Sequence, residues 1–309
     1  MINKKLKQIT TKIFDIIILT DPHYVNPIKI DDYIQNVLNE DNCVKLALES
    51  LGLKVGRLAW DDADFDWSTT KFILFRSTWD YFERFTEFST WLKMVSKETR
   101  LINSEKIIRW NMDKHYLKEL QQKGVPIIPT FYIEKGSKTT LKDIYKEINW
   151  ADTILKPCIS GGARHTYKLN EGNLEQHEIV FQKLISAEAM MLQPFQHSII
   201  EKGEVSLIII NGTYTHAVLK VAKKGDFRVQ DDWGGTVHIY TPSKEEIEFA
   251  ENAIKACIEF PIYARVDITT DNDGNLAIVE LELIEPELWF RNNKNAADLL
   301  AISIQNILS

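Results

Sequence analysis

The chain has 309 residues, of which 44% are hydrophobic and 26% are charged, so it can form one large domain or two to three small ones. Its net charge of −7 argues against a surface that binds nucleic acid or an anionic membrane. It lacks an apolar run long enough for a transmembrane helix, and its three scattered cysteines are typical of a reducing cytoplasm.

Strand and helix patterns alternate through the first hundred residues. Residues 15–19, 53–58 and 71–77 are apolar strands, and residues 31–51 and 86–97 carry apolar side chains at helical spacing. This alternation predicts a doubly wound parallel sheet, whose ligands bind beyond the carboxyl ends of the strands. The segment "RSTWDY" begins there, and either caps the sheet edge or contacts substrate through Arg76, Ser77, Thr78 and Asp80.

A second region starts near residue 111. It has a helix at 112–124, strands at 125–133 and 153–157, a helix at 173–188 and a strand at 190–196. Lys156 ends the second strand, and a loop of Ser160, Gly161, Gly162 and Ala163 follows. Backbone N–H groups of such a loop can cradle phosphate, although ordinary turns have the same composition. Cys158 is expected to be a buried, inert thiol.

The region after residue 200 has strong turn signals. Asn211-Gly212 between two apolar runs predicts a hairpin over residues 205–221, and Ser243 with Glu246 predicts a capping box at a helix start. Between them, "GDFRVQDDWGGT" contains Arg228. That segment is either a mobile loop that brings a cation to a phosphate or a plain surface connection. A final helix is expected at 296–308.

The stretch "VELELIEPEL" alternates carboxylates with apolar residues and predicts a strand over residues 276–283. A two-residue turn at Asp273-Gly274 would place Asp267 opposite Glu280 and Arg265 opposite Glu282. Carboxylates two residues apart on a strand lie about 6.5 Å from each other and repel. Three converging carboxylates suit a hard cation such as Mg²⁺. The alternative is a solvated strand face that Arg265 neutralises.

In order along the chain, these segments resemble the ATP-grasp superfamily. The matching segments are "NMDK", "LKP", "SGGAR", "LQPF", "GEVSL", "FRVQ…GGT", "RVD" and "VELELIEP". The whole chain, with "RSTWDY", is similar to the branch that contains the O-ureido-serine cyclo-ligases of cycloserine biosynthesis. More distantly, it is similar to bacterial glutathione synthetases and ribosomal-protein glutamate ligases.

The resemblance implies an N-terminal substrate-binding domain over residues 1–110 and a two-lobed ATP-grasp domain with antiparallel sheets over 111–195 and 196–309. It also implies ATP and Mg²⁺, with Mn²⁺ as a substitute. The implied ATP contacts are Lys114, Lys156, residues 160–163, Gln193, Phe195 and either Glu201 or Glu204. The implied catalytic residues are Arg228 and Arg265, and the implied metal ligands are Asp267, Glu280 and Glu282. Many relatives have Glu-x-Asn where this chain has Glu280-x-Glu282.

The implied activity is an ATP-dependent carboxylate–amine ligase that works through an acyl phosphate on small amino-acid-like substrates. A kinase on the same scaffold and a non-catalytic nucleotide-binding regulator are the alternatives. Ligation between two molecules and ring closure within one both fit. The cysteine content and the net charge predict a cytoplasmic protein without a nucleic-acid or membrane partner. The resemblance implies a homodimer or higher homo-oligomer.

Overall fold

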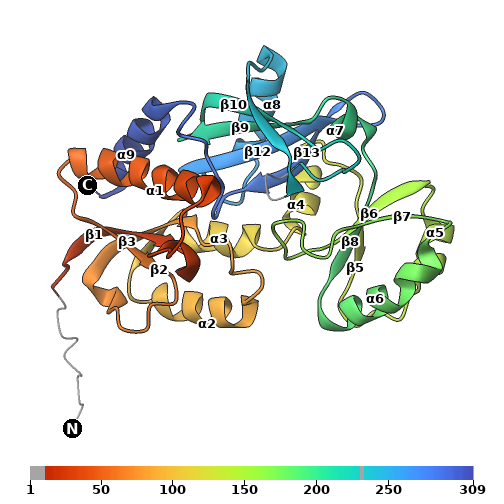
Figure 1. Ribbon diagram of the computed structural model, residues 1–309, viewed down its shortest axis with the longest axis horizontal. Helices are drawn as coiled ribbons and strands as arrows, with labels where there is room; N and C mark the ends of the chain where they lie inside the picture. The colour runs from red at the N-terminus through yellow and green to blue at the C-terminus, as the bar shows by residue number, and fades with distance from the viewer. Residues whose placement is uncertain (1–10, 230–232, 309) are drawn as a thin grey trace, which may run out of the picture. The chain divides into compact units, whose positions relative to one another are not determined.

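The computed structural model describes residues 11–229 and 233–308 (Figure 1). The chain divides into two compact units. Unit 1 comprises Met1–Glu105 and Glu285–Ser309, and unit 2 comprises Lys106–Ile284. Within the described residues, no helix is long and apolar enough to cross a membrane.

Unit 1 is built on the parallel sheet that the sequence predicts. Its strands run in the order β2-β1-β3-β4, and all pairings are parallel. The bounds are Phe14–Thr20 for β1, Val55–Ala59 for β2, Thr70–Ser77 for β3 and Arg100–Ile102 for β4. The central residues of β1 and β3 are buried on both faces, and there each strand has a continuous apolar run, residues 16–19 in β1 and 72–75 in β3. The expectation of a parallel α/β sheet is confirmed.

Helices cover both faces of this sheet (Figure 1). Phe75 of β3 points toward α2 (Phe85–Val95) and packs against Phe88 and Trp91. The next residue, Arg76, points to the opposite face and pairs with Glu40 of α1 (Asp32–Ser50). The final helix, α9 (Lys294–Leu308), packs beside α1. Two short 3-10 helices, Pro22–Tyr24 and Trp67–Thr69, complete the unit.

Glu40 joins α1 to the segment that precedes α9. One carboxylate oxygen accepts from Arg76 at 3.1 Å and from the backbone N–H of Leu288 at 2.7 Å. The other oxygen accepts from the backbone N–H of Phe290 at 2.9 Å. Burial raises the pKa of Glu40 to about 7 despite the opposing charge of Arg76. A buried acid therefore holds a chain segment that is some 250 residues away in sequence.

We expect Glu40→Ala to destabilise unit 1 strongly, because it leaves Arg76 and two backbone N–H groups without this acceptor. The cost is about 3–5 kcal/mol, the range for removing one partner of a buried ion pair. Thermal unfolding should show the loss. The exposed Glu83→Ala, at a residue of the loop before α2, serves as a control. Equal midpoints for both variants would contradict this role for Glu40.

Unit 2 contains two antiparallel sheets. One has the order β5-β8-β6-β7, and the other has the order β11-β10-β9-β12-β13. The first comprises β5 (Phe131–Ile133), β6 (Asp152–Pro157), β7 (Tyr167–Asn170) and β8 (Met190–Pro194). The second comprises β9 (Glu204–Ile210), β10 (Thr213–Val221), β11 (Thr236–Tyr240), β12 (Tyr263–Thr270) and β13 (Leu276–Glu282).

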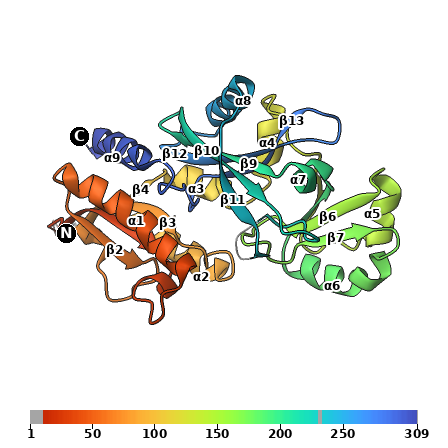
Figure 2. The same cartoon turned by 45° about the horizontal axis from the view of Figure 1, so that its top comes forward.

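Each sheet of unit 2 has its own core. Helices α5 (Leu141–Glu147) and α6 (Leu174–Ala187) pack on the smaller sheet (Figure 2). Helices α4 (Tyr116–Gln122) and α8 (Lys244–Lys255) contribute to the core of the larger one, with Ile107 of α3 (Glu105–Asn111). The short α7 (His197–Glu201) follows β8. The hairpin at Asn211-Gly212 and the capping box at Ser243 are confirmed.

The contact-based division differs from the sequence-based one at its C-terminal end. The sequence division assigns residues 285–309 to the last ATP-grasp lobe, whereas these residues cluster with unit 1. The physical reasons are the Glu40 bonds to residues 288 and 290 and the packing of α9 on α1. The division of unit 2 near residue 195 stays a proposal.

Candidate active site

Strands β12 and β13 bring the four charged residues of the sequence prediction together. Asp267 lies opposite Glu280, and Arg265 lies opposite Glu282. On its other side, β12 pairs with β9, which places Ser206 opposite Asp267. Side chains of directly paired residues share a sheet face, so carboxylates, guanidinium and hydroxyl meet on one patch. The predicted register is confirmed.

The turn between these strands is not the predicted two-residue turn. Beyond Asp267 the pairing changes to Ile268 with Ile278, and the strands end at Thr270 and Leu276. Five residues therefore connect them, and a β-bulge beside Asp267 restores the predicted register. The Asp271 side chain accepts from the backbone N–H groups of Asp273 and Asn275, which favours this longer turn.

A continuous chain of ion pairs crosses the patch. Lys220 of β10 pairs with Glu204 of β9 and, at 3.0 Å, with one oxygen of Asp267. Arg265 pairs with the same Asp267 oxygen at 2.9 Å and with Glu282. Ser206 donates to the second Asp267 oxygen at 2.6 Å. Asp267 is 2% exposed, so its charge is stabilised almost entirely by these partners.

Burial and charge act against each other on the pKa values of these acids. Burial alone would raise the pKa of Asp267, but Arg265 and Lys220 hold it below its ordinary value. Burial raises the pKa of Glu282 to about 7 against the effect of Arg265. Acids with divergent pKa values on one sheet face are typical of a functional site.

Glu280 lies at the edge of the patch and contacts Lys114 from the turn before α4. The two side chains approach to 3.0 Å, and Lys114 also donates to the backbone oxygen of Ser160 at 2.6 Å. Burial alone would raise the pKa of Glu280. The positive charge of Lys114, followed in size by that of Lys156, outweighs this effect and lowers the pKa. The side chain of Glu280 is 28% exposed, so this carboxylate can accept a further ligand.

Behind Glu280, two buried side chains fix strand β13. The hydroxyl of Tyr116 donates to the backbone oxygen of Leu281 at 3.0 Å and accepts from its N–H at 2.8 Å. The side-chain amide of Asn111 donates to the backbone oxygen of Leu281 at 2.7 Å and accepts from the backbone N–H of Leu283 at 2.8 Å. These four bonds set the position of a strand that carries two of the candidate ligands.

The carboxylates of the patch do not need a metal for charge balance. Four acids (Glu204, Asp267, Glu280, Glu282) meet four bases (Lys114, Lys156, Lys220, Arg265), so their formal charges cancel. Repulsion between the acids, which the sequence suggests, is offset by basic partners. Lys156 has no hydrogen bond or ion pair with a described residue, and burial lowers its pKa although Glu280 opposes this. Its ammonium is therefore free to contact an anion.

The loop of residues 160–163 contacts the segment of residues 225–236 that contains Arg228. The indole N–H of Trp233 donates to the backbone oxygen of Gly162 at 3.4 Å, and Arg228 lies 3.4 Å over the Trp233 ring. Arg228 pairs with Asp226 at 2.7 Å. Gly162 and Ala163 have φ values of 56° and 59°, so the loop adopts the left-handed conformation. The two predicted phosphate-binding segments therefore lie side by side. Gln230 also falls in this segment but lies outside the described residues.

Two of the implied ATP contacts lie at the end of β8: Gln193 belongs to the strand and Phe195 directly follows it. Gln193 and Phe195 are each 5% exposed. The amide of Gln193 donates to Thr130, and the Phe195 backbone oxygen accepts from the Asn272 amide at 2.8 Å. Glu201, at the end of α7, is exposed, whereas Glu204 belongs to the ion-pair chain.

The four predicted substrate residues lie in unit 1 and are buried. Arg76 pairs with Glu40, and Ser77 donates to Asp41 at 2.8 Å. Asp80 accepts from the Trp60 indole at 2.7 Å and pairs with Arg84. The hydroxyl of Thr78 has no hydrogen-bond partner within residues 11–229 and 233–308. Three of the four thus have partners within the unit.

Lys220, Ser206, Tyr116 and Asn111 are contacts of the patch that the sequence reasoning missed. Lys220 interrupts the apolar run of β10 between Leu219 and Val221, and it is 6% exposed. A lysine amid buried strand residues requires an acidic partner, which was the available signal. The other three became visible only through their partners in distant segments.

Two family models match the chain. The model of the N-terminal domain of D-cycloserine synthetase DcsG matches residues 16–103, and that of the prokaryotic glutathione synthetase ATP-grasp domain matches residues 118–272. The chain is 30% identical over 262 residues to the cycloserine biosynthesis protein DcsG of Streptomyces lavendulae. That alignment covers 78% of this chain and 85% of DcsG.

Solved structures agree with these matches. The crystal structure of D-cycloserine synthetase DcsG superimposes with a TM-score of 0.82 at 25% identity, covering 95% of this chain and 99% of that one. D-alanine–D-alanine ligase from Bacillus anthracis superimposes with a TM-score of 0.64 at 13% identity, covering 96% and 98%. At that identity the second likeness concerns the fold alone.

Proposed function

The chain belongs to the ATP-grasp ligase family that includes DcsG, and we propose that it activates a small amino-acid-like carboxylate as an acyl phosphate. A nitrogen nucleophile then displaces phosphate and forms a C–N bond. The observation that carries this proposal is the sheet face shared by Asp267, Glu280, Glu282 and Arg265. DcsG is named a D-cycloserine synthetase, and the proposed substrate has related chemistry.

In the proposed reaction, the carboxylate oxygen of the substrate attacks the γ-phosphorus of ATP and ADP leaves. The activated acyl group then has phosphate as its leaving group, which departs far more readily from carbon than an oxide ion does. The protein positions the reactants and stabilises the charge that develops on the phosphoryl oxygens. Lys156, Arg265 and Arg228 carry the positive charges for that task.

The patch fits a divalent cation, for which we propose Mg²⁺ with Mn²⁺ as a substitute. The side chains of Glu280 and Glu282 are 28% and 26% exposed and offer oxygen donors, as these hard cations require. Asp267 would join them from β12. When bound, the cation would neutralise charge on the nucleotide phosphates. Lys114 and Arg265 would then be released from the glutamates to contact phosphate.

For the nucleotide itself, we propose that Gln193 and Phe195 adjoin adenine and that Glu204, rather than Glu201, takes the ribose hydroxyls. Lys220 forms ion pairs with both Glu204 and Asp267. These ion pairs connect Glu204 to the carboxylates that we propose as ligands of the cation on the nucleotide phosphates. We further propose that Lys220 contacts phosphate. We propose that the 76–80 segment of unit 1 recognises the substrate. Its strongest candidate is the Thr78 hydroxyl, which has no hydrogen-bond partner among the described residues.

Trapping with hydroxylamine tests the acyl phosphate. With ATP, Mg²⁺ and a panel of amino-acid-like carboxylates, the wild-type chain should form a hydroxamate. We expect Lys156→Ala to lower its rate by about 10²–10³-fold, because a positive charge aimed at the phosphoryl group is lost.

The exposed Lys183→Ala on α6 is the matched control and should retain the wild-type rate. ADP release without hydroxamate would indicate a kinase and overturn the acyl phosphate. A wild-type rate in Lys156→Ala would remove the phosphate role of this lysine.

A further inference from the structure

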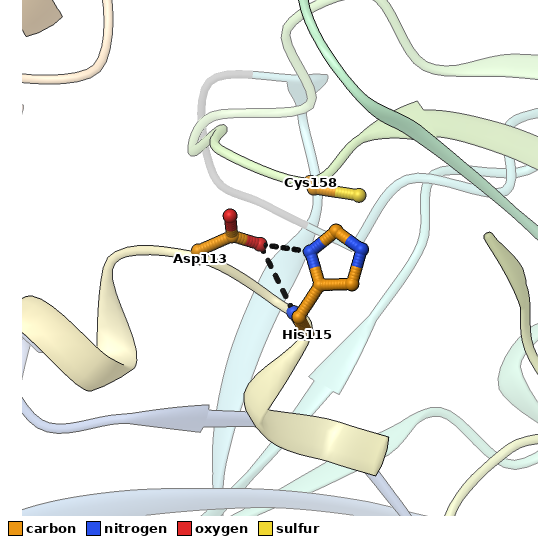
Figure 3. Close-up of side chains that lie close together, drawn as sticks. All are labelled: Asp113, His115 and Cys158. Carbon is orange, nitrogen blue, oxygen red and sulfur yellow. Dashed lines mark hydrogen bonds and ion pairs between the residues drawn. The ribbon is translucent and has the colours of Figure 1, made fainter. Parts of the chain in front are cut away.

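A second group of metal-ligating side chains lies in unit 2, apart from the carboxylate patch. Asp113 and His115 come from the turn between α3 and α4, and Cys158 follows β6 (Figure 3). One donor atom from each side chain lies within 4.8 Å of the other two. The cysteine is 1% exposed, whereas the other two are partly exposed. The thiol is buried, as the sequence predicts, and it lies beside an imidazole and a carboxylate.

The ring of His115 is oriented by three neighbours. Its Nδ1 lies 2.5 Å from one oxygen of Asp113, and its Nε2 lies 3.2 Å from an oxygen of Glu134. The ring stacks on Tyr132 with centroids 4.5 Å apart and planes at 22°. When Nε2–H donates to Glu134, Nδ1 carries the free lone pair of the ring, on the side that faces Asp113. Histidine ligands of metals commonly donate their other N–H to a carboxylate in this way.

The backbone holds the two segments of this group together. The N–H of Lys114 donates to the backbone oxygen of Cys158 at 2.9 Å, and the N–H of Cys158 donates to Ala189 at 2.9 Å. The N–H of His115 also donates to Asp113, at 3.1 Å. The three donors therefore have fixed attachment points, and only side-chain rotations are needed to adjust their spacing.

We propose that Asp113, His115 and Cys158 bind a transition-metal cation of the Zn²⁺ class, with Glu134 supporting the histidine. Oxygen, nitrogen and sulfur donors together suit Zn²⁺ and Co²⁺ and do not suit Mg²⁺. Three protein ligands leave a fourth tetrahedral position for water. The thiol proton is released to solvent when the metal–sulfur bond forms. The Asp113–His115 pair must open to about 3.3 Å, the spacing of two ligands at tetrahedral zinc.

This site is separate from the candidate ATP site but adjoins it. Lys114, which pairs with Glu280, lies between the two ligands Asp113 and His115 in the chain. A bound cation would restrain the backbone on both sides of that lysine. Its presence can be measured without any substrate, so its test is independent of the proposed ligase activity.

Titration of the full chain with Co²⁺ tests the proposal, in the presence of excess Mg²⁺ to fill oxygen-only sites. The wild-type chain should take up one equivalent with a thiolate-to-cobalt charge-transfer absorption, and Zn²⁺ should displace it. Cys158→Ser should lose the absorption. The matched control, Cys257→Ser, replaces another buried cysteine and should retain it.

His115→Gln and Glu134→Gln change partly or fully exposed residues and keep the test valid if Cys158→Ser fails to fold. His115→Gln should abolish stoichiometric binding. Glu134→Gln should weaken it by about 10–100-fold, the usual effect of losing a carboxylate that supports a histidine ligand. No thiolate absorption in the wild type, or an absorption that survives in Cys158→Ser or His115→Gln, would overturn the site.

Discussion

Glu280→Gln is expected to lower the rate of ATP turnover by at least about 10²–10³-fold and to change stability little. The substitution keeps the size of the side chain and removes the charge that a divalent cation needs. Glu280 is partly exposed and forms its ion pair with Lys114. Removing the charge of Glu280 therefore leaves the buried ion pairs of Asp267 intact. The melting temperature should fall by no more than about 4 °C, equivalent to roughly 1 kcal/mol.

ADP release with the substrate panel measures the first effect, and thermal unfolding measures the second. Glu245→Gln, on the exposed face of α8, is the matched control and should leave both unchanged. Near-normal ADP release in Glu280→Gln would contradict the metal-ligand role of this residue.

Asp267→Asn is expected to abolish ATP turnover and also to destabilise unit 2. Asp267 is the central anion between Arg265 and Lys220 and is 2% exposed. Removing its charge costs about 3 kcal/mol, at the lower end of the range for breaking a buried pair. The lower end applies because each base keeps one partner, Glu282 for Arg265 and Glu204 for Lys220. The melting temperature should fall by about 6–12 °C.

Asp273→Asn is the matched control for this variant, since Asp273 is exposed in the turn between β12 and β13. The two losses in Asp267→Asn should separate in experiment. Turnover should stay absent at low temperature, where the variant is still folded. Recovery of activity on cooling would mean that Asp267 acts on stability alone.

The sequence predicted the pairing of β12 with β13, but it did not predict the five-residue turn and the β-bulge that produce this pairing. Alternation of carboxylates with apolar residues required one face to be polar, and that requirement holds whatever the turn length. The predicted two-residue turn was wrong because Asp271 can satisfy two backbone N–H groups of a longer turn. The bulge beside Asp267 then compensates for the odd number of turn residues. Bulges leave little mark in a single sequence.

Contacts between distant segments account for most of what the sequence did not reveal. Glu40 appeared as one polar position of an amphipathic helix, yet it bonds to residues 288 and 290. Lys220 pairs with Glu204 and Asp267, which are 16 and 47 positions away. A lysine among buried strand residues indicates that an acidic partner is needed, but no local pattern identifies that partner. The parallel sheet of unit 1 and the hairpin at Asn211 were predictable, because periodicity and turn chemistry are local.

The proposed substrate residues of unit 1 belong to a buried polar network. Arg76, Ser77 and Asp80 are polar residues at the end of a strand, which is where ligands of parallel sheets bind. In the structure each has partners that also explain it as part of a buried network.

The central claim is that the face of β12 and β13 binds ATP together with a divalent cation. Isothermal titration calorimetry with ATP, in Mg²⁺ and in EDTA, tests it most directly. We predict binding by the wild-type chain that weakens by at least about tenfold, or about 1.4 kcal/mol, when Mg²⁺ is removed. In Glu280→Gln this dependence on Mg²⁺ should be largely lost. Equal ATP affinity of the wild-type chain with and without Mg²⁺, or no binding in either buffer, would contradict the claim.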